Sequence, residues 1–224
     1  MSKIAVDVVL LPSDEMMNKA IQANAELVEK SVARPSWPSF HGLEARATIV
    51  LNKENCLPHI SLAMGCIDER DIASIEGLLE TIARERKELI GGLKPTLPLT
   101  VTGIRTSINA RGEKVSVFEI EKTKELQLLH EKIMKKMVPY FIYEVTSEML
   151  YGDEQVAETS LLWIKNYSEK ASYANFFPHI TIGYGQIENG PFPLQFTASR
   201  LALCHLGNHC TCRKILVLVD LGSI

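Results

Sequence analysis

The chain lacks any long apolar segment. No apolar run approaches the roughly 20 residues that a helix needs to cross a bilayer. The first residues, Met1 to Val9, place the acidic Asp7 inside an apolar stretch, and they lack the basic start, apolar centre and cleavage site of a signal peptide. We therefore expect a cytoplasmic protein that does not associate with membranes.

The chain is also poor in cysteine, and it has only a small excess of charge of one sign. The 5 cysteines are an odd number and too few for a disulfide scaffold, so we expect reduced thiols. A net charge of −3 argues against the broad basic surface that duplex DNA needs, and leaves open a small nucleotide or an RNA end in a local pocket. No Gly-rich phosphate loop, Ser-His-Asp order or cysteine-nucleophile signature is present.

One phrase, by contrast, occurs twice. Leu57 to Gly65 reads Leu-Pro-His-Ile-Ser-Leu-Ala-Met-Gly, and Phe177 to Gly185 reads Phe-Pro-His-Ile-Thr-Ile-Gly-Tyr-Gly. Pro, His, Ile and the final Gly are identical, and the hydroxyl position is Ser in one copy and Thr in the other. Packing alone does not require Pro-His at the same offset twice, so the repeat indicates a shared functional site.

Strand geometry gives each copy a chemical face. On a β-strand, His59 and Ser61 point to one side, as do His179 and Thr181. The next position on that face is small in both copies (Ala63 and Gly183), which predicts open space beside each imidazole. A single His-x-Ser pair is more often a satisfied core histidine. Two such strands facing one another would form a pocket for a small tetrahedral group.

The remaining pattern predicts an α+β fold with helices and antiparallel strands in both halves. We expect a single bilobal domain over residues 1–224, with two pseudo-symmetric lobes meeting near residue 92 and a cleft between them. The motif strands should cover about 59–65 and 179–185. Other strands are expected at 4–11, 47–51, 97–104, 114–120, 196–206 and 209–221, and helices at 13–30, 68–89, 123–137 and 158–167.

The two Pro-His-Ile-(Ser/Thr) strands resemble the paired motifs of the two-histidine phosphoesterase superfamily. This family includes 2′-5′ RNA ligases and RNA 2′,3′-cyclic phosphodiesterases. The closing segment from Leu203 to Arg213 also resembles the terminal hairpin of bacterial members. The resemblance implies a bilobal fold, with His59 and His179 as the catalytic pair and Ser61 and Thr181 as phosphate-binding hydroxyls.

The chemistry of phosphodiester hydrolysis suits these residues. It needs a base to activate water and an acid to protonate the departing ribose oxygen, and histidine serves in both roles near neutral pH. One imidazole should be neutral and the other charged in the reactive state. The sequence does not decide which is which; our working assignment takes His59 as the acid and His179 as the base. No metal or cofactor is required.

These observations predict a monomeric, metal-independent hydrolase. Its substrate would carry a 2′,3′-cyclic phosphate or a 2′-5′ phosphodiester on a nucleotide or RNA end, with a role in RNA processing. Two alternatives stay open. The same residues could catalyse reversible 2′-5′ RNA ligation, or the cleft could bind nucleotides or RNA ends without catalysis.

Other features of the sequence are open to a functional or a structural interpretation. Trp37 and Phe40, in a Pro-rich loop at 33–42, are either packed aromatics or a flap that stacks on a base. The cysteines and histidines between Cys204 and Cys212 could bind a metal, but a two-residue hairpin at 207–208 with small residues filling its strands is favoured. His130, on a charged helix, is expected to be exposed. Four basic side chains either contact a substrate phosphate or are solvated charges on the surface: Arg105, Arg111, Lys114 and Arg213.

Overall fold

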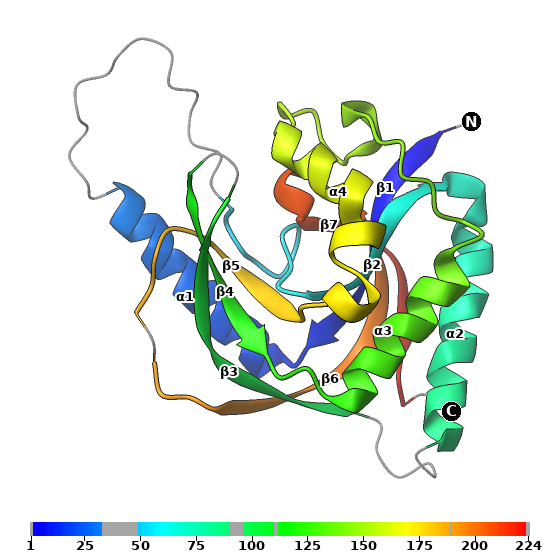
Figure 1. Ribbon diagram of the computed structural model, residues 1–224, viewed down its shortest axis with the longest axis horizontal. Coiled ribbons are helices and arrows are strands. Elements are labelled where there is room, and N and C mark those ends of the chain that lie inside the picture. Colours follow the sequence, from blue (N-terminus) through cyan, green and yellow to red (C-terminus); the bar gives the residue numbers. More distant parts are fainter. Residues whose placement is uncertain (1, 33–48, 90–95, 110–111, 189, 223–224) are drawn as a thin grey trace.

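A computed structural model describes residues 2–32, 49–89, 96–109, 112–188 and 190–222 (Figure 1). The strands are β1 (Lys3–Pro12), β2 (Ile60–Asp68), β3 (Leu97–Ile108), β4 (Lys114–Ile120), β5 (His179–Tyr184), β6 (Leu194–Leu206) and β7 (Cys212–Asp220). The helices are α1 (Asp14–Val32), α2 (Ile72–Leu89), α3 (Lys124–Met137) and α4 (Glu158–Lys170). Short 3₁₀ turns are η1 (Glu69–Asp71), η2 (Ser147–Met149), η3 (Tyr173–Asn175) and η4 (Asn208–Cys210).

The strands form one antiparallel sheet in the order β2-β1-β6-β3-β4-β5, with β7 paired to β6. The long strand β6 belongs to both halves of the molecule. Its first residues, Leu194 to Ala198, pair with β3, and its later residues pair with β1 and β7. The α+β class and the antiparallel pairing are therefore confirmed, and the bilobal description is consistent with two half-sheets that share β6.

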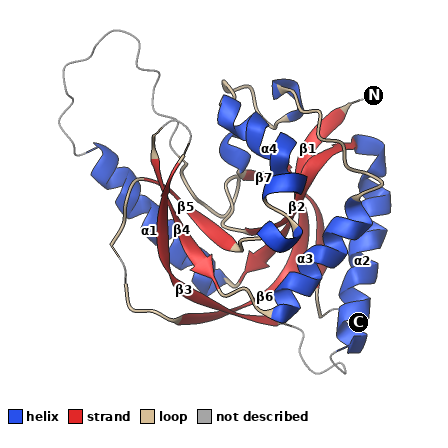
Figure 2. Cartoon of the chain, in the orientation of Figure 1, coloured by secondary structure: helices blue, strands red, loops and turns tan. Residues whose placement is uncertain are grey.

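The helices cross from one half of the chain to the other. Helix α1, which follows β1, packs on β5, whereas α3 and α4, which precede β5, pack on β2 (Figures 1 and 2). Each motif strand is thus covered by helices from the opposite half. The buried core continues from these helices onto the sheet, with fully buried side chains such as Leu10, Ile60 and Leu126.

The two motif strands share an unusual register. Along β2, Ala63 pairs with Val8 and Ser61 with Val9, so Leu62 is an extra residue in a β-bulge. Along β5, Gly183 pairs with Ser116 and Thr181 with Val117, so Ile182 is extra. The bulge falls at the same place in both copies of the phrase, which extends the pseudo-symmetry of the sequence to the backbone.

Several sequence expectations were wrong in detail. Residues 49–51, the described end of the segment expected as a strand, form no strand. The helix expected from residue 68 begins only at Ile72, because the Asp68 side chain accepts from the backbone of Arg70 and closes a 3₁₀ turn first. Among the described residues, no helix is both long and apolar enough to span a membrane.

The closing hairpin also differs from its prediction. Its connection is the 3₁₀ turn η4, in which His209 and Cys210 have positive φ angles of 58° and 53°, so the strands are not joined by a two-residue turn. Cys204 and Cys212 lie in adjacent strands with their Cα atoms 5.5 Å apart and form a disulfide. The expectation that all cysteines are reduced was therefore wrong for this pair.

Candidate functional site

Both motif histidines are held by the same local hydrogen bond. The Nδ1 atom of His59 lies 2.7 Å from the carbonyl oxygen of Leu57, and Nδ1 of His179 lies 2.8 Å from that of Phe177. A carbonyl oxygen can only accept, so Nδ1 carries the proton in each ring. This fixes the tautomer and leaves the lone pair of each Nε2 atom free for chemistry.

Two buried side chains hold the bulges in place. His130 on α3 places Nδ1 2.7 Å from the Leu62 carbonyl oxygen, and Asn24 on α1 donates through Nδ2 to the Ile182 carbonyl oxygen at 2.7 Å. Leu62 and Ile182 are the extra residues of the two bulges, so the crossed helices anchor equivalent points of both motif strands. The expectation that His130 is exposed was wrong: it is 0% exposed and its ring stacks on Phe176.

The sequence predicted open space at the small residue that follows each hydroxyl, and this prediction was wrong. The bulge breaks the strict alternation of side chains, so Ala63 is 0% exposed and lies in the core. Gly183 has a φ of +147°, and a Cβ atom there would lie 2.9 Å from Nδ2 of Asn24. Glycine is needed at this position for its backbone angle and for the approach of Asn24.

One small cavity brings the two motifs together. A space of about 20 Å³ is lined by His59 from the first copy and Thr181 from the second, with further walls from Leu51, Cys56 and residues 209–211. His179 lies within electrostatic range of His59, since a proton on His179 would lower the pKa of His59 further. Ser61 is half-buried and its hydroxyl faces the carboxyl group of Asp7.

Burial keeps both imidazoles neutral. It lowers the pKa of His59 to about 4, against the opposing effect of the Leu57 carbonyl, and it lowers the pKa of His179 in the same way. Uncharged imidazoles with Nδ1 protonated are two potential bases. Asp7 on β1, which the sequence did not single out, places Oδ2 4.0 Å from Nε2 of His59.

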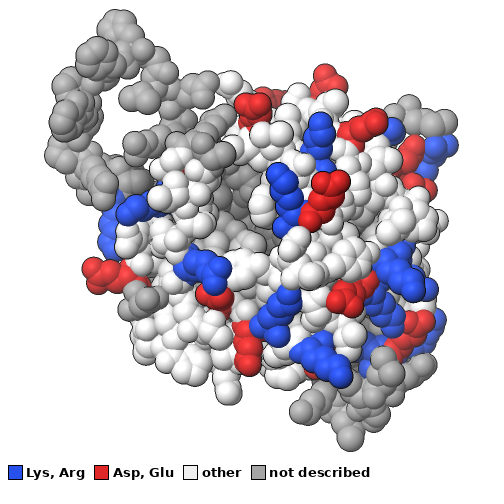
Figure 3. All heavy atoms as spheres, viewed as in Figure 1, with Lys and Arg blue, Asp and Glu red and all other residues white. Residues whose placement is uncertain are grey.

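The described cations among those considered for phosphate binding have protein partners. Arg105 forms an ion pair with Glu119 at 2.8 Å and lies 4.5 Å above the ring of Phe177, which stacks on His179. Lys114 donates to Gln186. Acidic and basic side chains are interspersed over the face shown in Figure 3.

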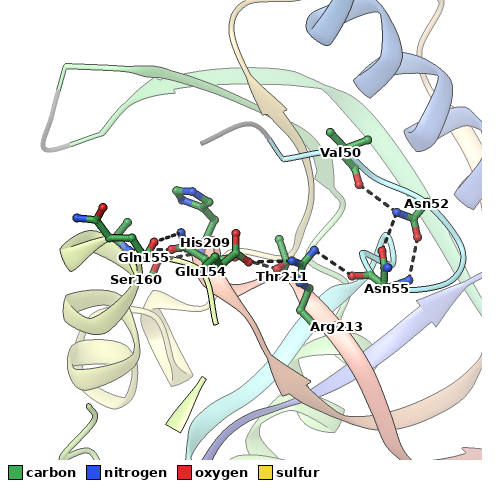
Figure 4. Close-up of polar contacts among 11 residues, drawn as sticks. Val50, Asn52, Asn55, Glu154, Gln155, Ser160, His209, Thr211 and Arg213 are labelled. Atoms are coloured by element: carbon green, nitrogen blue, oxygen red, sulfur yellow. Dashed lines mark hydrogen bonds and ion pairs between the residues drawn. The ribbon is translucent and has the colours of Figure 1, made fainter. Parts of the chain in front are cut away.

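A second, more open cavity of about 220 Å³ continues from the first, and the two share Ile49, Cys56, His209 and Thr211. Figure 4 shows His209 and Arg213 between the start of α4 and the Asn52–Asn55 turn. Arg213 bridges the two sides by donating to Glu154 at 2.8 Å and to the Asn55 carbonyl at 3.3 Å.

The other sequence candidates are placed as follows. Trp37, Phe40 and Arg111 lie outside the described residues. Cys204 and Cys212 are joined to each other, so neither is a thiolate ligand, and the described residues contain no group of three metal-ligating side chains. The sequence signal that could have pointed to Asp7 was a lone acid in a Val-rich strand; Asn24 and His130 gave no such signal.

Comparisons with known proteins agree with this fold. No family model and no curated protein sequence matches the chain. The protein TT0787 of Thermus thermophilus matches over 98% of this chain and 99% of its own, at 15% identity and a TM-score of 0.57. E. coli LigT in apo form matches at 12% identity over 98% of both chains with a TM-score of 0.45, and LigT complexed with 3′-AMP matches at 11% identity over 99% of this chain and 100% of its own, with a TM-score of 0.42. The likeness to TT0787 shows a shared fold.

Proposed function

We propose that this protein is a metal-independent two-histidine phosphoesterase that hydrolyses a 2′,3′-cyclic phosphate, or a 2′-5′ phosphodiester, on a nucleotide or RNA end. The observation that carries the proposal is the matched presentation of His59 and His179. Each ring is tied through Nδ1 to the carbonyl two residues earlier, so each presents Nε2. Acid–base catalysis of phosphodiester hydrolysis uses two such groups.

The two imidazoles and the residues around the cavity can carry out the reaction in the following way. One Nε2 takes a proton from water as the water oxygen bonds to phosphorus, and the other imidazole, once protonated, gives a proton to the ribose oxygen as its bond to phosphorus breaks. Thr181, on the cavity wall, can donate a hydrogen bond to a phosphoryl oxygen that gains charge in the transition state. The adjoining cavity of about 220 Å³ offers space for the rest of the substrate.

The test is a substrate panel with full-length protein. It contains 2′,3′-cyclic nucleotides, RNA ending in a cyclic phosphate and 2′-5′ dinucleotides, each assayed with and without EDTA. We expect hydrolysis of at least one class and equal rates with EDTA. Loss of activity with EDTA that zinc or manganese restores would exclude the metal-independent reaction. Joining of RNA ends would identify the ligase, and binding without turnover the non-catalytic module.

Substitutions then assign the reaction to the histidines. His59→Ala and His179→Ala should each lower kcat by about 10³-fold or more, and the double variant should lose little further, because the two rings act as a unit. His205→Ala is the matched control, since His205 is a half-buried histidine bonded to the Met149 carbonyl that lines neither of the two cavities. Near-wild-type turnover by His59→Ala would refute the proposed role.

A further inference from the structure

Asp7 is a buried carboxyl group next to the candidate site. It is 0% exposed, and neither of its oxygens has a hydrogen-bond partner. Its closest basic neighbour is His59, whose Nε2 lies 4.0 Å from Oδ2. Ionising a buried carboxyl group without a partner is costly, and burial raises the pKa of Asp7 to about 8. At neutral pH this carboxyl group therefore retains its proton.

The groups that face Asp7 do not supply a countercharge. The hydroxyl of Ser61 and the backbone of the following two residues oppose the rise in pKa, although none meets hydrogen-bond geometry. Tyr167 approaches from α4 and Cys210 from η4, and burial raises the pKa of both, so both are neutral. In the described part of the chain, His59 is the only basic group within 4.0 Å of the carboxyl.

The two half-sites differ at this position. Asp7 pairs with Met64 on β2, and Val115 pairs with Tyr184 on β5. Met64 and Tyr184 occupy the same place in the repeated phrase, so Val115 is the pseudo-symmetric counterpart of Asp7. The first histidine therefore has a carboxyl group beside it, whereas the equivalent position near the second is occupied by valine.

The proposed reaction needs this asymmetry. Hydrolysis requires one base and one protonated acid, yet burial leaves both imidazoles neutral with a lone pair at Nε2. The site as it stands has two bases and no acid. A protonated carboxyl group 4.0 Å from one Nε2 is a source of the missing proton.

We propose that Asp7 is a positioning residue that supplies His59 with a proton, which makes His59 the general acid and His179 the general base. This inference rests on the function proposed above. When an anionic phosphate binds beside His59, Oδ2 of Asp7 and Nε2 of His59 close from 4.0 Å to hydrogen-bond distance, the Asp7 O–H bond breaks and the proton moves to Nε2. His59 passes it to the leaving ribose oxygen, and His179 takes a proton from the attacking water. After product release, His179 loses its proton to solvent and Asp7 regains one.

The first test needs no turnover. Nitrogen-15 NMR of the imidazoles at pH 7 is recorded for wild type and Asp7→Asn, with and without saturating inorganic phosphate. We expect phosphate to protonate Nε2 of His59 in wild type and not in Asp7→Asn. The same His59 signal in both phosphate-bound proteins would overturn the proposal. Should Asp7→Asn fail to fold, carbon-13 spectra of wild type must show the Asp7 carboxyl ionising when phosphate binds, and a carboxyl that stays protonated would overturn it.

The second test is the pH dependence of kcat/KM on a 2′,3′-cyclic nucleotide. Asp7→Asn should lower activity at pH 7.5 by about 100-fold or more and move the alkaline limb at least one pH unit toward acid. Val115→Asn, which places the same amide at the counterpart position, should leave the alkaline limb where it is. An equal loss at every pH would mean a merely structural role for Asp7. Proton transfer on phosphate binding without hydrolysis of any ester would refute the proposed function and leave the transfer itself intact.

Discussion

At the scale of single residues, the site depends on side chains that touch its backbone. Gly183 shows this most directly, because its φ of +147° is in the range that favours glycine and Asn24 occupies the space beside it. The repeated phrase has alanine at the equivalent position, Ala63, where the chain tolerates a Cβ atom. The two copies are therefore alike in register and different in how closely a helix side chain approaches.

We expect Gly183→Ala to reduce the free energy of unfolding by about 1–3 kcal/mol, from backbone strain and displacement of Asn24. Gly103→Ala is the matched control, since no atom beyond its chain neighbours lies within 4 Å of a Cβ there and its φ is not positive. It should change stability by less than about 1 kcal/mol. Urea unfolding of both variants measures the difference, and equal stabilities would contradict the role given to Gly183.

At the scale of elements, the crossed helices α1 and α3 fix the two bulges. Asn24 donates from one amide to the carbonyls of Ile49 and Ile182 and accepts from the backbone of Leu51. It thereby joins α1, the segment before the first motif, and β5. His130 performs the equivalent task for β2 and also accepts from the backbone of Tyr173.

Asn24→Ala should cost about 2 kcal/mol or more of stability, because it strips partners from three buried backbone groups. It should also lower kcat, since the bulge at Ile182 adjoins Thr181. Asn166→Ala is the control: this half-buried asparagine donates within its own helix, to the Leu162 carbonyl. Chemical denaturation and steady-state assays test both effects, and an Asn24→Ala protein as stable as the control would argue against the anchor.

At the scale of the whole molecule, buried titratable groups make stability depend on pH. Histidines with lowered pKa bind protons more readily when unfolded, so stability falls as pH drops below about 6.5. The contribution of Asp7 to stability changes with pH in the opposite direction. Its pKa rises from 3.8 to about 8 on folding, so the stability it contributes at low pH is lost as pH rises through that range.

Wild-type protein should therefore lose stability relative to Asp7→Asn by about 1 kcal/mol per pH unit between pH 6.5 and 8, because the histidines titrate in both proteins and cancel in the difference. In thermal unfolding this corresponds to a change of about 2–4 °C per pH unit in the difference between the two Tm values for a chain of this size. A Tm difference that is constant from pH 6.5 to 8 would show that Asp7 is ionised at neutral pH.

The features of the site that could be predicted are those that depend on residues close together in the sequence. His59, His179 and the flanking strands were predicted because the phrase and its two-residue period are local and repeat. The bulges were not, since no residue type marks them. Asn24 and His130 bond carbonyls 158 and 68 residues away, which no local pattern reveals. Alternation alone also misplaced Ala63, because it assumes a strand without an extra residue.

The crossing of the helices has a consequence for the order of events during synthesis. Helix α1, at residues 14–32, is translated long before the strand it covers, β5, at residues 179–184. Strand β1 can pair early with β2, at residues 60–68, but its other edge waits for β6, at residues 194–206. The apolar side of α1 must remain without this native partner until β5 has been translated, so this helix is where a nascent chain most needs protection by a chaperone.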